Sequence, residues 1–249
     1  LGTALMKNMV AIGATSALVN LDTTTFEELI TNMFSKKGEK VVDMNIEALN
    51  EGYRLMQEHL STIQGDFELE AINEDLHLYM IGNDAIGLGA ISAGSKFMAA
   101  YPITPASEIM EYMIANLPKV GGTVVQTEDE IAAATMAIGS NYAGVRGFTA
   151  SAGPGLSLMM ESIGLSGMTE TPFVIINTQR GGPSTGLPTK QEQSDLMQMI
   201  YGTHGDIPKI VVAPNDAEDA FYLTVEAFNL AEEYQCPVII LSDLQLSLG

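Results

Sequence analysis

The chain has 249 residues, enough for one large domain or two unequal ones, and its 46% hydrophobic content is ample for a core. Its net charge of −20, from 31 acidic against 11 basic residues, should repel phosphate backbones and argues against a nucleic-acid partner. No charge-free apolar run approaches the roughly 18 residues of a membrane span, and the single cysteine, Cys236, precludes an internal disulfide or a CxxC metal or cluster site.

Residues 1–60 predict a helical segment. Apolar residues recur at helical spacing in the stretches 6–13, 26–33 and 41–53, and no motif that carries chemistry is visible there. Residues 61–75 are polar and acidic with a glycine, which is typical of a linker. The chain begins with Leu1 rather than Met and stops at Gly249 just after a strand-like run, so we interpret it as a piece of a longer polypeptide.

From residue 76 to residue 249 the sequence predicts alternating strands and helices. Strands separated by helices of 10–18 residues argue for an α/β fold with a doubly wound, mostly parallel sheet covered on both faces. The expected strands are 76–80, 97–101, 123–127, 147–150, 173–177, 210–213 and 238–241, and the later expected helices are 129–143, 156–167, 191–201 and 216–234.

The octapeptide YPITPASE, residues 101–108, follows the second expected strand. Pro102 and Pro105 restrict the backbone, and Ser107 is a plausible N-cap for a helix that begins with acidic residues. The stretch therefore predicts a rigid strand-to-helix turn. In an open α/β sheet such a turn lies at the carboxyl ends of the strands, where ligands bind, although most turns of this kind only reverse the chain.

Three acidic residues, Glu128, Asp129 and Glu130, open the helix that follows the third expected strand. Acids in a first turn are favoured by the helix dipole, and that alone can explain them. Glu130 also begins an apolar stripe that continues through Ile131 and Ala134, so we expect it to face inward while Glu128 faces solvent. A carboxyl at the buried end of a helix is placed to share a proton.

Two glycine-rich segments complete the set of candidate motifs. The turn 151–155 could hold a phosphate at a helix N-terminus, but it lacks both the Walker ending and the GxGxxG spacing. The segment 180–190 is either a plain long loop or a binding loop. Because basic residues are scarce in this chain, Arg180 and Lys190 at its ends stand out, and either could bind a substrate carboxylate through a charge-assisted hydrogen bond.

Four runs occur in an order that resembles a known family. They are YPITPASE (101–108), TEDEIAA (127–133), ASAGPGLSLM (150–159) and GPSTGLPTKQEQSDL (182–196). Together they resemble the α subunit of 2-oxoacid:ferredoxin oxidoreductases, thiamine-diphosphate enzymes that oxidise 2-oxo acids to acyl-CoA. The resemblance covers roughly residues 76–249, and the most similar type is the 2-oxoglutarate branch.

The resemblance implies that 76–249 is the pyrimidine-binding domain and that 1–60 is the C-terminal part of a γ-like domain fused ahead of it. It implies that Glu130 is the carboxylate that hydrogen-bonds the aminopyrimidine N1′ and favours its imino tautomer. The implied cofactor-binding residues are Glu130, Thr104, Pro102, Gly153 and Gly155, and the implied substrate-binding residues are Thr104, Lys190 and Arg180. Many relatives carry Arg at the position of Lys190, and Lys cannot make the bidentate contact of Arg.

The resemblance also implies partners. No GDG motif with a downstream Asn is present, so the β subunit should supply Mg²⁺ and the diphosphate site, and the absence of cysteine clusters places the iron–sulfur cluster there too. CoA would be a co-substrate, ferredoxin would dock through the complex, and the assembly would be a cytoplasmic dimer of heterodimers in which this chain alone is inactive. Two alternatives remain: the pyrimidine domain of another thiamine enzyme, such as a transketolase-like synthase, and a non-catalytic α/β interaction module.

Overall fold

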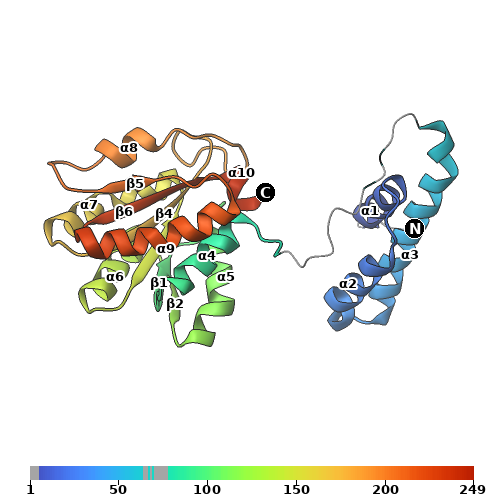
Figure 1. Ribbon diagram of the computed structural model, residues 1–249, viewed down its shortest axis with the longest axis horizontal. Helices are drawn as coiled ribbons and strands as arrows, with labels where there is room; N and C mark the ends of the chain where they lie inside the picture. Colours follow the sequence, from blue (N-terminus) through green and yellow to red (C-terminus); the bar gives the residue numbers. More distant parts are fainter. Residues whose placement is uncertain (1–5, 64–66, 68, 70–77) are drawn as a thin grey trace. The chain divides into compact units, whose positions relative to one another are not determined.

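The computed structural model describes residues 6–63, 67, 69 and 78–249 (Figure 1). The chain divides into two compact units, Leu1–His77 and Leu78–Gly249. The expected linker, 61–75, falls largely outside the described residues, as do Leu76 and His77 of the first expected strand. Each unit is therefore described by itself.

The first unit contains the helices α1 (Lys7–Leu18), α2 (Thr24–Phe34) and α3 (Glu39–His59). Two glycines let α1 and α3 cross closely. A Cβ atom at Gly13 would lie 1.9 Å from the carbonyl oxygen of Leu49, and one at Gly52 would lie 2.1 Å from that of Val10. Because no side chain fits at these points, the backbones of α1 and α3 are in contact. The three helices confirm the helical segment expected from the sequence.

The second unit is a six-stranded, wholly parallel sheet in the order β2-β1-β3-β4-β6-β5, which confirms the expected doubly wound fold. Helices connect the strands (Figure 1). In chain order the elements are α4 (Gly82–Ser92), β1 (Phe97–Ala100), α5 (Ser107–Asn116), β2 (Thr123–Gln126), α6 (Glu130–Tyr142), β3 (Gly147–Ser151), α7 (Gly153–Met168), β4 (Phe173–Gln179), α8 (Leu196–Tyr201), β5 (Ile210–Val212), α9 (Ala217–Tyr234), β6 (Pro237–Asp243) and α10 (Leu244–Leu248).

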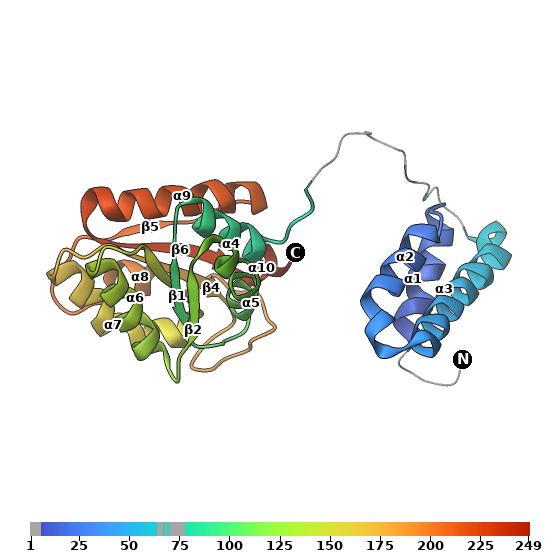
Figure 2. The ribbon, with the colours of Figure 1, turned by 90° about the horizontal axis from the view of Figure 1, so that it is seen from below.

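The sheet has an apolar core on each face. Along β4, Val174 and Ile176 pack with α4, α5 and α9, whereas Phe173 and Ile175 pack with α6, α7 and α8. Figure 2 shows α9 on one side of the sheet and α6 and α7 on the other. Since β3 and β4 are in register at Ser151 and Asn177, both of these residues point to the α6–α7 side, as Ile175 does.

The structure corrects three expectations about local elements and adds one helix. Residues 78–80 are not a strand, and Ser107 does not cap α5, because it is the first residue of that helix and follows Ala106. Helix α8 begins at Leu196 rather than 191, since the residues before it form an extended loop that ends on Asp195. The short helix α10 was not predicted; its first turn is capped by the Asp243 carboxylate, which accepts a hydrogen bond from Leu246 N at 2.9 Å.

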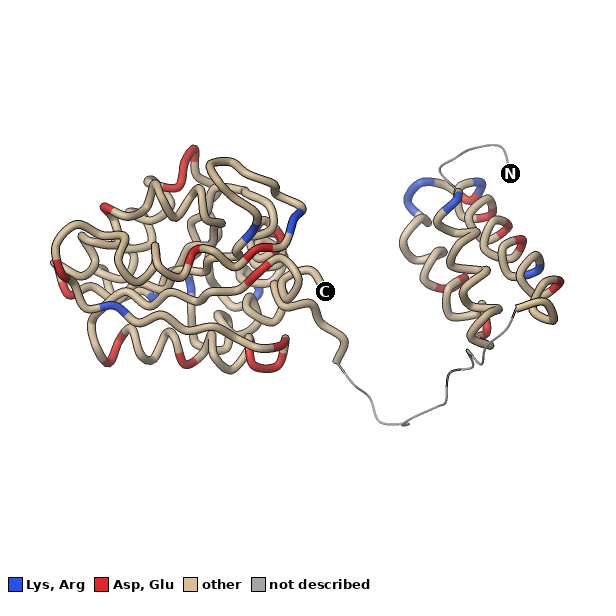
Figure 3. The backbone as a smooth tube through the Cα atoms, turned by 90° about the horizontal axis from the view of Figure 1, so that it is seen from above, with Lys and Arg blue, Asp and Glu red and all other residues tan. Residues whose placement is uncertain are grey.

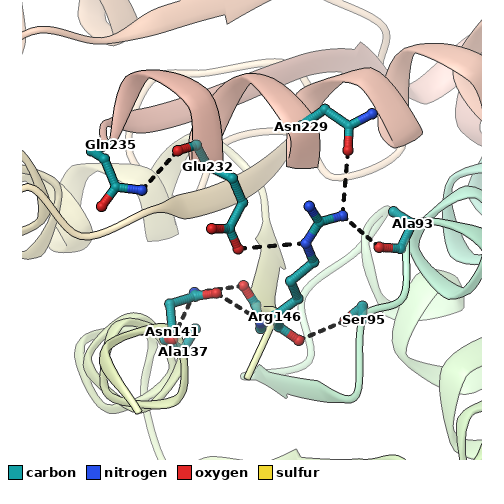
Figure 4. Close-up of polar contacts among 9 residues, drawn as sticks. Ala93, Ser95, Ala137, Asn141, Arg146, Asn229, Glu232 and Gln235 are labelled. Carbon is teal, nitrogen blue, oxygen red and sulfur yellow. Dashed lines mark hydrogen bonds and ion pairs between the residues drawn. The ribbon is translucent and has the colours of Figure 1, made fainter. Parts of the chain in front are cut away.

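Arg146 connects three elements at the amino ends of the strands, the edge opposite the candidate site (Figure 4). Its Nη1 donates to the carbonyl oxygen of Ala93 just after α4 (2.7 Å) and to Asn229 Oδ1 on α9 (3.4 Å). Its Nε lies 3.4 Å from Glu232 Oε1, also on α9. A cation at the carboxyl end of α4 is favoured by the helix dipole, so Arg146 has a structural role.

We expect Arg146→Gln to lower the free energy of unfolding by about 1–3 kcal/mol, because hydrogen bonds from a charged donor contribute about 1.5–3 kcal/mol and this side chain is partly exposed. Urea denaturation followed by circular dichroism measures the change. Lys119→Gln is the matched control, since its ammonium donates only to an exposed Asn116 oxygen at 2.8 Å. Equal midpoints for the two variants would contradict the structural role of Arg146.

Candidate functional site

The turn after β1 and the loop after β4 are tied together by Arg180. Its Nη1 donates to the carbonyl oxygen of Thr104 at 2.5 Å, and its Nη2 donates to that of Thr185 at 2.6 Å. The residue is 7% exposed, and burial lowers the pKa of its guanidinium, which nevertheless stays charged. Arg180 therefore joins the YPITP turn to the glycine-rich loop. In that turn Thr104 is exposed and Pro102 is half-buried.

Glu130 is the first residue of α6 and is 6% exposed, whereas Glu128 is exposed. The residue between them, Asp129, caps the helix by accepting a hydrogen bond from Ala132 N at 2.7 Å. With the capping taken by Asp129, the Glu130 side chain is left for other contacts. Within the described residues, its carboxyl has no hydrogen-bond partner.

The first turn of α7 packs directly on this carboxyl. A Cβ atom at Gly155 would lie 2.0 Å from Ser151 Oγ, 2.8 Å from Glu130 Cγ and 2.8 Å from Glu130 Oε1. Only a glycine leaves room for both side chains here. The structure thus brings Gly155 and Glu130, two of the sequence-predicted site residues, into contact.

The other end of the same turn contacts a carboxylate that the sequence analysis did not single out. Asp195 is 9% exposed, and its Oδ2 would lie 2.8 Å from a Cβ atom at Gly153. That oxygen accepts a hydrogen bond from Asn177 Nδ2 at 3.0 Å, and Asp195 N donates to Gln179 Oε1 at 3.0 Å. The sequence did contain a signal for such a contact: Asn177 and Gln179 are polar residues at the end of an otherwise apolar strand, and buried polar side chains need hydrogen-bond partners.

A pocket of about 450 Å³ opens between the first turn of α7 and the glycine-rich loop. Gly153 and Arg180 line it, together with Pro154, Ser157, Leu158, Gly181, Gly182, Pro183, Ser184, Thr185, Ser194, Asp195 and Gln198. Glu130 and Lys190 are not among its lining residues. The site residues therefore share one edge of the sheet without forming a closed cavity.

Lys190 differs from the other cations of residues 78–249, all of which the structure describes. The side chains of Lys96, Lys119, Arg146, Arg180 and Lys209 each donate to a protein oxygen. Lys190 is exposed, and its ammonium has no such partner in this part of the chain. Figure 3 shows that cations are few and scattered along the chain. Since its ammonium has no partner in residues 78–249, Lys190 is free to bind an anion.

Several buried polar atoms near the carboxyl ends of β3 and β4 have no hydrogen-bond partner. They include Ser151 Oγ, Asn177 Oδ1, Thr178 Oγ1 and Arg180 Nε. An unpartnered buried polar atom costs about 1–3 kcal/mol, and its presence in a native structure calls for an explanation. A ligand or partner at this edge of the sheet would supply one.

In the part of the chain that the structure describes, no group of three His, Cys, Asp or Glu side chains is placed to hold a metal ion. The helices described here also include none that is long and apolar enough to cross a bilayer. Cys236 is 1% exposed and unpaired, and burial raises the pKa of its thiol, as expected for a packed side chain.

Known proteins resemble this chain in sequence and in structure. The 2-oxoglutarate synthase subunit KorA of Methanothermobacter marburgensis is 54% identical over 165 residues, which are 66% of this chain and 44% of that protein. The 2-oxoacid:ferredoxin oxidoreductase 1 subunit alpha of Sulfurisphaera tokodaii is 40% identical over 98% of this chain and 40% of that protein. A 2-oxoglutarate:ferredoxin oxidoreductase from Magnetococcus marinus, solved with 2-oxoglutarate, coenzyme A and succinyl-CoA bound, matches with a TM-score of 0.86 and 48% identity over 97% of this chain and 42% of that one.

The chain spans less than half the length of these relatives. A family model described as pyruvate ferredoxin/flavodoxin oxidoreductase matches residues 1–55. A second model, described as pyruvate flavodoxin/ferredoxin oxidoreductase, thiamine diphosphate-binding, matches residues 88–247, nearly the whole of the parallel sheet and its helices. The resemblance read from the four sequence runs is confirmed, and the chain belongs to the family of 2-oxoacid:ferredoxin oxidoreductase α subunits.

Proposed function

We propose that this chain supplies the cofactor-activating half-site of a thiamine-diphosphate-dependent 2-oxoacid:ferredoxin oxidoreductase. The whole enzyme would decarboxylate a 2-oxo acid oxidatively to its acyl-CoA and reduce ferredoxin. The observation that carries this proposal is the Glu130 carboxyl, which is 6% exposed at the start of α6 and has no hydrogen-bond partner among the described residues.

The residues around Glu130 fit the aminopyrimidine end of thiamine diphosphate. A neutral, flat ring requires a carboxyl that can hydrogen-bond its nitrogen, which Glu130 offers. It also requires space beside the protein backbone, which Gly155 leaves next to Glu130 because it has no side chain. The fit for the diphosphate end is poor. No three-acid group that could hold a metal ion is found in the described residues, and Arg180, which lines the pocket at the first turn of α7, already donates both terminal nitrogens to carbonyl oxygens. We therefore assign only the aminopyrimidine end to this chain.

When bound, thiamine diphosphate supplies a nucleophilic carbon that holds the electrons released on decarboxylation. Glu130 would share a proton with the nitrogen N1′ of the aminopyrimidine and so favour its imino tautomer. Gly153 and Gly155 would leave room for the ring beside the first turn of α7, and Pro102 stiffens the turn that carries Thr104. Arg180 holds that turn against the glycine-rich loop through its hydrogen bond to the Thr104 carbonyl.

The substrate carboxylate would be bound by Lys190, with the Thr104 hydroxyl as a second donor. Lys190 is the cation whose ammonium is free in residues 78–249, whereas the terminal nitrogens of Arg180 already donate to carbonyl oxygens. Arg180 therefore contributes mainly through the loops that it joins. We propose 2-oxoglutarate as the 2-oxo acid, because 2-oxoglutarate is named in a relative that is 54% identical and in the structure that is 48% identical.

The missing half of the site would come from a β subunit that carries Mg²⁺, the diphosphate site and the iron–sulfur cluster. Exposed apolar side chains on α6 and α7 support a partner on this side of the sheet. They are Ile131 (49% exposed), which follows Glu130, Leu158 (51%) and, at the far end of α7, Met168 (83%). Residues 1–60 would be the end of a γ-like domain. The complex would be a cytoplasmic dimer of heterodimers that takes CoA and passes electrons to ferredoxin.

The test is reconstitution of the full-length α subunit with its β subunit, followed by a screen of 2-oxo acids. We expect CoA-dependent reduction of ferredoxin or viologen that requires thiamine diphosphate, with no turnover by the 249-residue chain alone. Turnover without CoA or an electron acceptor would favour a transketolase-like synthase. Failure of the complex to bind any thiamine species would favour a non-catalytic interaction module.

In that enzyme, Lys190→Ala should raise KM for the 2-oxo acid more than it lowers kcat. Losing one charged hydrogen bond costs about 1.5–3 kcal/mol, and the cost appears in KM when the contact is equally strong in the ground and transition states. Lys190→Arg is the conservative control and should keep KM near the wild-type value, since a guanidinium can bind the carboxylate with two hydrogen bonds. An unchanged KM in Lys190→Ala would indicate that Arg180 or a residue of the partner subunit, and not Lys190, binds the substrate carboxylate.

A further inference from the structure

Ser151 is the last residue of β3 and is fully buried, with 0% of its surface exposed. Its hydroxyl oxygen has no hydrogen-bond partner in the described chain. Such an atom destabilises the fold, because it has lost its hydrogen bonds to water without replacing them. Replacing this serine by alanine would remove that cost, so packing alone does not explain the hydroxyl.

The neighbourhood of Ser151 suggests what the hydroxyl is for. The point where a Cβ atom at Gly155 would lie is 2.0 Å from Ser151 Oγ and 2.8 Å from Glu130 Oε1. The hydroxyl and the carboxyl therefore face the same small gap beside the α7 backbone. Both lack a partner among the described residues, and one is a donor while the other is an acceptor.

A second acceptor lies nearby and has to be weighed. Asn177 is in register with Ser151 on the adjacent strand, and its Oδ1 is also buried and unpartnered. Its Nδ2 donates to Asp195 at 3.0 Å, which fixes the amide. A carboxylate accepts a hydrogen bond about twice as strongly as a neutral amide does, so the hydroxyl should prefer Glu130.

We propose that Ser151 is a positioning residue for Glu130: its hydroxyl donates to one carboxyl oxygen when the site is assembled, and so turns the other oxygen toward the ligand. This inference rests on the proposed function, since it assigns Glu130 a ligand. The movement required is a rotation of the Glu130 side chain, because both groups already border the same gap. Ser151 itself need not touch the cofactor.

Thr149 provides a matched control on the same strand. Its hydroxyl is also 0% exposed and unpartnered, and it points to the same side of the sheet because it is in register with Ile175. It lies two residues before Ser151, about 7 Å farther from the carboxyl edge of the sheet. Thr149→Val removes a comparable hydroxyl at nearly constant volume, away from Glu130.

The experiment has one arm on the 249-residue chain and one on the reconstituted enzyme. In urea denaturation of the chain, Ser151→Ala and Thr149→Val should both leave the midpoint unchanged or raise it. In the reconstituted enzyme with thiamine diphosphate and no substrate, hydrogen–deuterium exchange at thiamine C2 should slow about 10-fold or more in Ser151→Ala, the effect of losing one charge-assisted hydrogen bond. In Thr149→Val the exchange at thiamine C2 should proceed at the wild-type rate. In Ser151→Cys, which keeps a weak hydrogen-bond donor, the exchange rate should lie between those of Ser151→Ala and the wild type.

Other results would overturn the proposal. A wild-type exchange rate in Ser151→Ala, together with slow exchange in Glu130→Gln, would refute the role of Ser151 while leaving the proposed function intact. Equal slowing in Thr149→Val, or a clearly lower urea midpoint in Ser151→Ala, would show that the hydroxyl acts through the fold. Wild-type exchange in Glu130→Gln would refute the proposed function and this inference together.

Discussion

In the reconstituted enzyme, Glu130→Gln should slow hydrogen–deuterium exchange at thiamine C2 by roughly 10²–10⁴, the usual contribution of one acid–base partner. Glutamine keeps the size of the side chain and can still hydrogen-bond a ring nitrogen, so the cofactor should remain bound. It cannot share a proton with that nitrogen. The buried position of Glu130 at the start of α6 makes the effect large, because a carboxyl that is only 6% exposed has little access to solvent.

Glu128→Gln is the control for this prediction, because it changes the same functional group two residues earlier on the exposed side of the helix start. Its effect should be limited to a few tenths of a kcal/mol of helix-dipole stabilisation. Slow exchange in Glu128→Gln together with normal exchange in Glu130→Gln would identify Glu128 as the activating carboxyl. Normal exchange in both variants would mean that this chain does not activate the cofactor.

Gly155→Ala should be the most damaging single methyl addition in α7. The new Cβ atom would lie 2.0 Å from Ser151 Oγ and 2.8 Å from Glu130 Oε1, so either the helix or the carboxyl has to move. Overpacking of this kind costs about 1–3 kcal/mol, which a urea denaturation of the chain alone can measure. In the reconstituted enzyme the displaced carboxyl should also slow exchange at thiamine C2.

The same helix contains its own control. At Gly164 no atom lies within 4 Å of the point that an added Cβ atom would occupy, and the backbone is helical. Gly164→Ala should therefore raise the free energy of unfolding by up to about 1 kcal/mol, because alanine has the higher helix propensity. If the two variants had the same stability, the close contact of Gly155 with Ser151 and Glu130 would be refuted.

Local sequence patterns were sufficient for most of the fold. The short apolar run at 173–176, for example, is rich in β-branched residues, as is typical of a buried strand. Helices between such strands indicate a parallel sheet. The inward orientation of Glu130 was also expected, but the apolar stripe from which we inferred it was wrong at Ile131, which is 49% exposed. The buried face of α6 instead continues from Glu130 through Ala133 and Ala134, because these positions lie three and four residues along the helix. At residues 191–195 the expected helix does not form, because hydrogen bonds with Asn177 and Gln179 hold Asp195 in the loop. At Ser107 the expected cap is wrong because the helix already includes that residue.

The sequence by itself determined the family, the doubly wound parallel sheet and the carboxyl that opens α6, because each depends on residues close together in the chain. Only the tertiary structure showed that Gly155 and Ser151 lie against that carboxyl and that Asn177 holds the Asp195 carboxylate beside Gly153. It also showed that the terminal nitrogens of Arg180 donate to the Thr104 and Thr185 carbonyl oxygens. These contacts join residues separated by up to 76 positions. Spacing along the chain does not encode them, since they arise where parallel strands bring their carboxyl ends to one edge of the sheet.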